Sequence, residues 1–213
     1  MNGTTVRNRE ASVRLGKDRI EVADKPLAAA EKLYLMVNKP RGIVTGAADE
    51  KGRDTVYSLL PANLRWVAPA GRLDQASEGL LLFTNDSEWA ARITDPKSCL
   101  EKTYHVQIRA VGDAPLLEAL QHGVEIPKGD TLKAKRAFVL RAGEKNSWLE
   151  IVLDEGRNRH IRRMLDALGV EVLRLIRVSI GPVRLGDLTK GGHRALRPEE
   201  KLALDRLLQG LDR

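Results

Sequence analysis

The fold is decided by the stretch Gly71-Arg-Leu-Asp-Gln-Ala-Ser-Glu-Gly-Leu-Leu-Leu-Phe83. Its last five residues form a fully apolar run, which is too short for a helix and is typical of a buried central strand. Asp74 lies in the loop before this strand, at the edge of a rigid sheet, and a positioned nucleophile needs such support. An aspartate in a loop also commonly hydrogen-bonds its own turn, so position alone leaves both interpretations open.

The sequence on both sides of this strand predicts the other strands and helices. We expect strands over 33–37, 66–69, 103–108, 131–140, 147–153, 171–180 and 183–185. We expect helices over 87–93, 113–122, 158–168 and 198–208, with one or two helical turns over 55–60. Strands separated by single helices, several of them antiparallel, predict an α+β domain built on one mixed sheet.

Composition excludes several classes of protein. The 213 residues suffice for one larger domain or two small lobes, and 42% of them are hydrophobic, as in a globular chain. The single cysteine, Cys99, excludes an intrachain disulfide framework and suits a reducing cytoplasm. No apolar run approaches the roughly 20 residues of a membrane span, and the N-terminus lacks the apolar core of a signal peptide.

The positive charge is concentrated in one part of the chain. Residues 157–197 contain ten bases and three acids, so this segment carries the whole net charge of +7. A basic segment on an otherwise neutral chain indicates a polyanionic partner, most simply a nucleic acid. A solvated face on a basic protein is the equally ordinary alternative.

Two further residues near Asp74 are candidates for chemistry. Glu78 follows Asp74 by four positions, so a two-carboxylate glycosidase site is possible. Tyr104 shares a strand face with Val106 and Ile108, which favours an ordinary core tyrosine. The functional alternative for Tyr104 is a ring at the mouth of a pocket that stacks on a nucleobase.

The expected helix over 158–168 carries both apolar and basic residues. Its apolar stripe consists of Ile161, Met164, Leu165 and Leu168. Arg162 flanks this stripe and could reach inward to a carboxylate, or could pair with Asp166 on the surface. Arg159 and Arg163 fall on the opposite face, where they would meet solvent or phosphate.

Other chemistries find no support in the sequence. The four histidines have no metal-ligand spacing to one another or to Cys99. No phosphate-binding glycine-rich loop with its lysine is present, and no G-x-G-x-x-G follows a strand.

Several motifs together resemble a known family, the RsuA/RluB/RluE/RluF group of pseudouridine synthases. The matching blocks are Asn38-Lys-Pro-Arg-Gly42, Gly71 to Asp86, Lys102-Thr-Tyr104, Glu155-Gly-Arg-Asn-Arg-His-Ile-Arg-Arg-Met164 and Leu173-Arg-Leu-Ile-Arg177 followed by Gly181. They cover about residues 32–198 in order. A lone Gly-Arg-Leu-Asp would be weak, whereas the blocks together are highly specific.

The resemblance implies an enzyme that isomerises uridine in RNA without cofactor or metal. Asp74 matches the catalytic aspartate of the family, Tyr104 its active-site tyrosine, and Arg162 the basic residue that pairs with the aspartate. The implied fold is a curved, mixed, mostly antiparallel sheet with flanking helices and a central RNA-binding cleft. The arginines expected to bind RNA phosphates are Arg72, Arg159, Arg163 and Arg177.

These residue types suit the reaction. Uridine must lose its N1–C1′ bond, turn and reattach through C5, and the target base must leave its stack to reach the pocket. Asp74 would act as nucleophile or base while Arg162 keeps it ionised and oriented. Whether Asp74 attacks C1′, attacks C6 or abstracts a 2′ proton stays open.

The N-terminal segment departs from the pattern of most of this group. Most members begin with an RNA-binding module of the kind found in a small-subunit ribosomal protein, whereas some thirty residues precede the match here. The chain therefore resembles the RluE type, which lacks the module, or a truncated RluB type. We expect 1–31 to be a tail or the remnant of such a module and 32–213 to be the catalytic domain.

The expected partner is ribosomal RNA, most simply of the large subunit. The other substrates considered are small-subunit ribosomal RNA and transfer RNA, and a non-catalytic ribosomal-RNA-binding or assembly factor is the rival of a different class. We expect a cytoplasmic monomer without an obligate protein partner.

Overall fold

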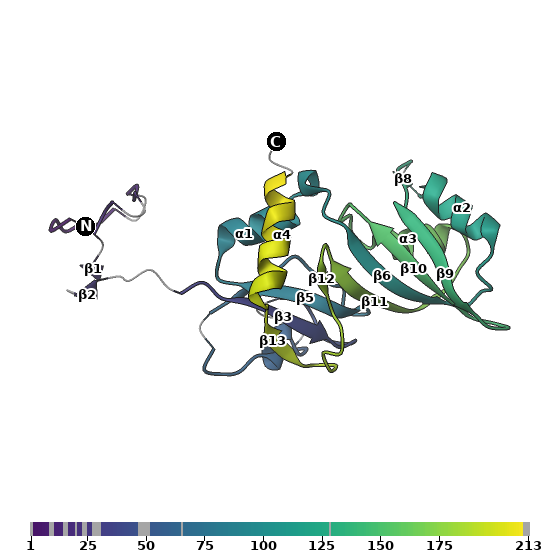
Figure 1. The fold of residues 1–213 in the computed structure, drawn as a ribbon, viewed down its shortest axis with the longest axis horizontal. Helices are drawn as coiled ribbons and strands as arrows, with labels where there is room; N and C mark the ends of the chain where they lie inside the picture. Colours follow the sequence, from purple (N-terminus) through teal and green to yellow (C-terminus); the bar gives the residue numbers. More distant parts are fainter. Residues whose placement is uncertain are drawn as a thin grey trace. The chain divides into compact units, whose positions relative to one another are not determined.

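The computed structural model describes residues 2–8, 11–14, 17–19, 21–22, 25–26, 31–46, 52–64, 66–127 and 129–210. The chain divides into two compact units, Met1–Lys32 and Leu33–Arg213. In the described part of the first unit, β1 (Glu21–Val22) pairs with β2 (Lys25–Pro26) in antiparallel fashion. The fold of the second unit, which contains every candidate site residue, is described below (Figure 1).

The second unit is built on a nine-stranded sheet. Its main strand order is β13-β3-β5-β11-β6-β10-β9, while β4 pairs with β5 and β12 pairs with β11. The strands are β3 (Tyr34–Lys39), β4 (Ala68–Ala70), β5 (Glu78–Thr84), β6 (Lys102–Ile108), β9 (Arg136–Ala142), β10 (Ser147–Leu153), β11 (Val172–Ile180), β12 (Val183–Arg184) and β13 (His193–Ala195). A separate ribbon pairs β7 (Val124–Glu125) with β8 (Thr131–Leu132).

The helices lie against this sheet (Figure 1). The α-helices are α1 (Ser87–Thr94), α2 (Ala114–His122), α3 (His160–Ala167) and α4 (Pro198–Gly210), and two short 3₁₀ helices are η1 (Val56–Leu59) and η2 (Pro96–Ser98). The local sequence explains where α1 and α2 begin. The Asp86 carboxylate accepts a hydrogen bond from the Trp89 amide at the start of α1, and Asp113 does the same for Leu116 at the start of α2.

One parallel junction joins two antiparallel halves of the sheet. Strand β5 meets β11 in the pairs Ile176↔Glu78 and Arg177↔Gly79, and the other pairings of the nine strands are antiparallel. One half therefore contains β13, β3, β5 and β4, and the other contains β12, β11, β6, β10 and β9. We call the contact between β5 and β11 the seam.

Three hydrophobic cores stabilise the two halves. The α4 core packs Met36, Leu80 and Leu82 against α1 and α4. The α3 core packs Val106, Ile108, Leu149 and Ile151 against α2 and α3. The loop core covers the other face of the first half, where Val37, Leu81 and Phe83 contact Val56 and Leu73. Alternation along β5 explains why Leu80 and Leu81 enter different cores.

The sequence-based prediction of an α+β fold with a mixed, mostly antiparallel sheet is confirmed. The run of Leu80, Leu81, Leu82 and Phe83 is indeed a central strand, each residue of which is fully buried. The single strand expected over 131–140 is wrong, because the chain forms β8 and then β9. Between them the Ala134 amide donates to the Leu120 carbonyl, which draws the chain away from a continuous ladder.

Candidate active site

The loop that carries Asp74 is held from several sides. Gly71 has a φ of +88°, which turns the chain after β4, and the Leu73 side chain is buried in the loop core. The Thr45 hydroxyl donates to the Leu73 carbonyl at 2.7 Å and accepts from the Leu73 amide at 3.3 Å. The Ser77 amide donates to the Asp74 carbonyl at 2.9 Å, so the backbone on both sides of Asp74 is fixed.

Lys39 supports the same loop from inside the protein. Its side chain is fully buried, and the ammonium donates to the carbonyls of Pro40, Asp74 and Ser77 at 3.0, 3.1 and 2.9 Å. Burial lowers the pKa of Lys39 to about 8, although the charges of Asp74 and Glu78 act in the opposite direction. Lys39 is not among the residues predicted for the site. The available signal is a lysine that ends a strand whose preceding run, Leu35–Val37, is apolar.

Arg162 reaches this loop from α3, in the other half of the molecule. Its guanidinium Nη2 donates to the Ala76 carbonyl at 2.9 Å, two residues after Asp74, and its buried Nε has no hydrogen-bond partner. Burial and the neighbouring Arg159 lower the pKa of Arg162, while the negative charge of Asp74 raises it. An arginine stays protonated under these conditions, so a cation lies close to the Asp74 carboxylate.

Tyr104 lies where the two halves meet. It belongs to β6, opposite Arg177 of β11, and its ring packs against both the α3 core and the loop core. The ring is half-buried and therefore keeps a surface that a ligand could contact. The structure thus places Asp74, Tyr104 and Arg162 around the seam, with Asp74 in one half and Tyr104 and Arg162 in the other, although they are far apart in the sequence.

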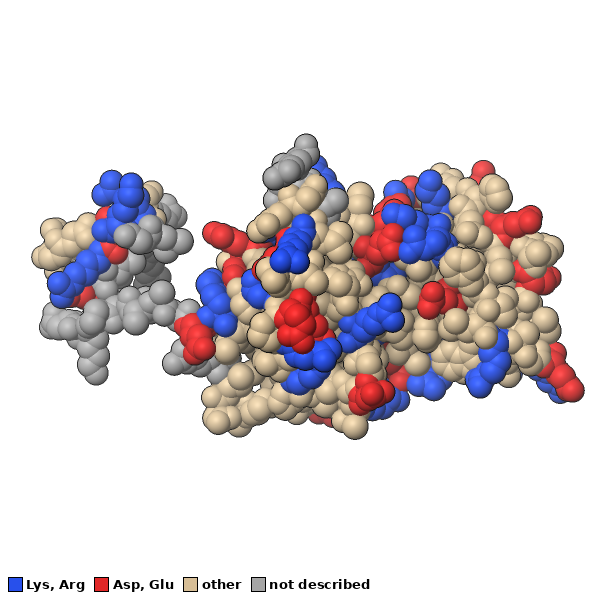
Figure 2. Space-filling view, in the orientation of Figure 1, with Lys and Arg blue, Asp and Glu red and all other residues tan. Residues whose placement is uncertain are grey.

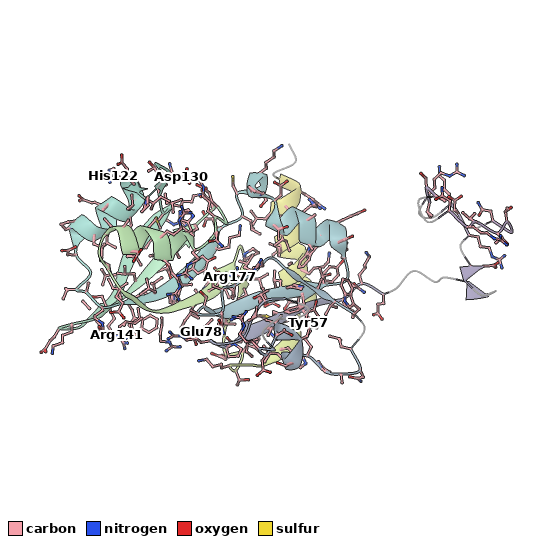
Figure 3. The ribbon with its side chains drawn as sticks, turned by 180° about the vertical axis from the view of Figure 1, so that it is seen from behind. Tyr57, Glu78, His122, Asp130, Arg141 and Arg177 are labelled. Carbon is pink, nitrogen blue, oxygen red and sulfur yellow. The ribbon has the colours of Figure 1, made fainter. Side chains whose placement is uncertain are left out.

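Arg177 is placed differently from the sequence-based expectation. Its side chain is only 6% exposed, and it donates to the carbonyls of Leu80 at 2.8 Å and Arg72 at 3.4 Å. The predicted phosphate contact of Arg177 therefore does not fit this structure. Charge counting could not reveal this, because carbonyls from a neighbouring strand and loop solvate the guanidinium inside the fold. Figure 3 labels Arg177 near the centre of the sheet.

The other expected phosphate-binding arginines are accessible. Arg72 and Arg159 are exposed, and Arg163 is half-buried with its guanidinium 4.0 Å from the Asp130 carboxylate. A polar pocket of about 230 Å³ lies along α3 and is lined by Arg159, Arg162, Arg163, Asp166, Val170, Glu171 and Val172. Three guanidinium groups at one pocket beside the Asp74 loop form a surface that can receive phosphates.

Glu78 cannot serve as the second carboxylate of a glycosidase. Its side chain is 3% exposed, and both carboxylate oxygens are bonded at 3.1 Å to the Arg174 guanidinium. It also pairs with Lys190 at 2.6 Å. Glu78 lies two residues before Leu80 and four before Leu82, so it shares their face of β5. It therefore faces the α4 core, away from the loop core that contains Leu73. A carboxylate held in this way cannot activate water beside Asp74.

The residues that the structure describes contain no evident metal site. No group of three or more His, Cys, Asp or Glu side chains among them could hold a metal ion. No helix in this part of the chain combines the length and apolar character needed to cross a membrane. Cys99 is exposed and is not part of a disulfide.

The chain is similar in sequence to proteins of known family. The chain is 36% identical to ribosomal large subunit pseudouridine synthase B of Bacillus subtilis (strain 168), over 87% of this chain and 76% of the relative. It is 38% identical to ribosomal large subunit pseudouridine synthase E of Vibrio vulnificus (strain CMCP6), over 80% of this chain and 78% of the relative.

Structural and family-level comparisons agree with these relatives. A crystal structure of a pseudouridylate synthase superposes with a TM-score of 0.73 at 31% identity, over 95% of this chain and 86% of that chain. Residues 33–167, which include Asp74, Tyr104 and Arg162, match the family model described as RNA pseudouridylate synthase. The chain therefore belongs to the RNA pseudouridylate synthase family.

Proposed function

We propose that this protein converts a uridine of large-subunit ribosomal RNA into pseudouridine, with Asp74 as the catalytic nucleophile or base. The observation that carries the proposal is the position of Asp74, which lies in a fixed loop at the seam with Arg162 bonded two residues away. The names of relatives at 36% and 38% identity support ribosomal RNA of the large subunit as the substrate.

Each of the three site residues has a distinct role in this proposal. Asp74 reacts with the flipped nucleotide, and the Arg162 guanidinium holds the loop that carries Asp74 through the Ala76 carbonyl. The half-buried ring of Tyr104 stacks on the uracil base after it has left the RNA stack. The base separates from C1′ at N1, turns and bonds through C5, while the hydrogen on C5 leaves as a proton and N1 gains one, so the atoms balance without a co-reactant.

Phosphate contacts complete the substrate interaction. Arg72, Arg159 and Arg163 bind backbone phosphates around the target nucleotide, which adds affinity but no choice of sequence. We further propose that the protein acts as a cytoplasmic monomer without a cofactor or protein partner, and that residues 32–213 are its catalytic domain.

Release of the C5 hydrogen gives a direct test. Unmodified ribosomal RNA that carries tritium at C5 of uridine is incubated with the wild-type protein and with Asp74→Asn, which preserves the shape of the side chain. We expect release of tritium with the wild type and at least a 10³-fold slower release with Asp74→Asn, as for loss of a nucleophile. RNA binding by both proteins without any release would favour a non-catalytic ribosomal-RNA-binding factor.

A further inference from the structure

The seam controls how the groups of the active site face one another. Asp74 belongs to the loop that enters β5, whereas Tyr104 and Arg162 belong to the other half of the molecule. Strands β5 and β11 share only the two register pairs Ile176↔Glu78 and Arg177↔Gly79. So short a backbone ladder leaves side chains to fix the relative orientation of the halves.

Glu78 and Arg174 form a side-chain ion pair across this seam. The Glu78 carboxylate accepts from Nε and Nη2 of Arg174 in β11, each at 3.1 Å, and it also pairs at 2.6 Å with Lys190, which lies between β12 and β13. A bidentate guanidinium–carboxylate pair constrains orientation as well as distance. The Glu78 side chain is 4% exposed, whereas those of Arg174 and Lys190 are 41% and 55% exposed, so the carboxylate is buried and its partners reach the surface.

The contacts of Glu78 are linked to Asp74 through a short piece of backbone. Only three residues separate the two, and the Ser77 amide donates to the Asp74 carbonyl. On the opposite face of the sheet, Arg177 donates to the carbonyls of Leu80 and Arg72. The segment around Asp74 is thus anchored to β11 from both faces. Glu78 supplies the ionic anchor on the face away from the loop core.

We propose that Glu78 is a positioning residue, which fixes β5 against β11 through Arg174 and so holds Asp74 in register with Tyr104 and Arg162. The inference rests on the proposed function of Asp74 and extends it. Glu78 does not touch the substrate. It acts through the seam, where a displacement of about 1 Å is enough to slow a reaction about 10²-fold.

The test compares two seam variants with a matched control. Glu78→Gln and Arg174→Gln each weaken the pair across the seam. Glu101→Gln removes a pair of the same chemistry, to Arg136 at 2.6 and 3.3 Å and to Lys135 at 3.0 Å, that lies within one half. For both seam variants we expect kcat to fall about 10- to 100-fold with KM within about threefold. The double variant should be no slower than the slower single variant, because both remove one interaction.

A second readout does not depend on activity. Amide hydrogen exchange in residues 74–80 should be at least about tenfold faster in Glu78→Gln than in the wild type, and unchanged in Glu101→Gln. A general loss of stability would instead raise exchange throughout the sheet and lower kcat only near the melting temperature. If the wild type released no tritium from labelled RNA, the proposed function would fail, and the exchange measurement would still decide whether Glu78 fixes this segment.

Three outcomes would overturn the inference. They are a kcat within twofold of the wild type in both seam variants, exchange in residues 74–80 that does not change in Glu78→Gln, and an equal loss of kcat in Glu101→Gln.

Discussion

Neighbouring arginines on α3 have different surroundings. Arg162 and Arg163 are both half-buried and both line the polar pocket, but Arg162 also bonds to the Ala76 carbonyl, whereas Arg163 lies 4.0 Å from Asp130. In the proposed function, Arg162 acts beside the Asp74 loop and Arg163 meets the RNA backbone. One helix would then carry a residue for the chemical step next to a residue for binding.

Substitution of each arginine should separate these roles. For Arg162→Ala we expect kcat to fall at least about 100-fold with a small change in RNA affinity, because the Asp74 loop loses its partner. For Arg163→Ala we expect RNA affinity to fall a few-fold and the slope of log K against log salt to flatten by about one, with kcat nearly unchanged. Single-turnover rates and binding isotherms at several salt concentrations measure both effects. The reverse pattern would show that the two faces of α3 have been assigned the wrong way round.

Sequence alone could nominate Asp74, Tyr104 and Arg162, because their residue types and flanking motifs are local features. It could not identify the groups that hold them. Lys39 meets the Asp74 carbonyl across 35 positions of sequence, and Arg177 meets the Arg72 carbonyl across 105. Such contacts arise from strand order, which no local pattern encodes, and a buried arginine looks like a surface arginine in a charge count.

Among the strands, β5 depends on a glycine at the seam. Gly79 has a φ of +103°, and a Cβ there would lie 2.3 Å from the Arg177 carbonyl oxygen. Gly42 has a similar φ of +98°, but a Cβ there would meet nothing within 4 Å. An alanine at either position would therefore adopt an unfavourable positive φ. Only at Gly79 would its Cβ also clash with β11 across the seam.

Alanine at these two glycines measures that difference. We expect Gly42→Ala to cost about 1 kcal/mol of unfolding free energy, as for a positive φ alone. Gly79→Ala should cost at least about 2 kcal/mol more and should also lower kcat, because β5 and β11 must move apart. Chemical denaturation and single-turnover rates test this. Equal costs for the two variants would mean that the seam tolerates a wider spacing.

The start of α4 is anchored to β13 through Glu200. The carboxylate accepts two bonds from Arg194 at 2.7 Å each, and from the amide and side chain of Arg197 at 2.9 and 3.0 Å. The hydrogen bonds from Arg194 are the main cause that lowers the pKa of Glu200 to about 2. Since the folded pKa lies below the unfolded value of 4.5, this stabilisation is present above about pH 4.5 and is lost as the pH falls toward 2.

Glu200→Gln should therefore destabilise the protein in a pH-dependent way. At pH 7 we expect a loss of about 1–3 kcal/mol in unfolding free energy. The difference between wild type and variant should shrink as the pH falls from 5 toward 2. Urea unfolding at several pH values gives this difference. A gap that stays constant over that range would place the stabilisation elsewhere.

At the scale of the whole molecule, part of the positive charge of residues 157–197 stabilises the fold. Among the described residues, six of the ten bases in this segment form ion pairs with acids outside it: Arg157, Arg163, Arg174, Lys190, Arg194 and Arg197. On the face seen in Figure 2, basic and acidic side chains are interspersed rather than gathered into one basic field. Composition therefore indicated the class of partner better than it located the binding surface.

The architecture, too, was only partly predictable from the sequence. Local patterns predicted most strands and helices, since β5, β6, β10 and β11 carry clear apolar signals. The order of the strands was not readable from those patterns. The parallel seam between β5 and β11 is a property of the assembled sheet, and the candidate active site lies at that seam.

The most direct test of the central claim is to map pseudouridine in ribosomal RNA. Unmodified large- and small-subunit RNA transcripts are treated with wild-type protein or Asp74→Asn, and pseudouridines are located by carbodiimide labelling and reverse transcription. We expect a new pseudouridine at a defined site of the large-subunit RNA with the wild type and none with Asp74→Asn. No new pseudouridine in the large-subunit RNA, or the same product with Asp74→Asn, would contradict the account.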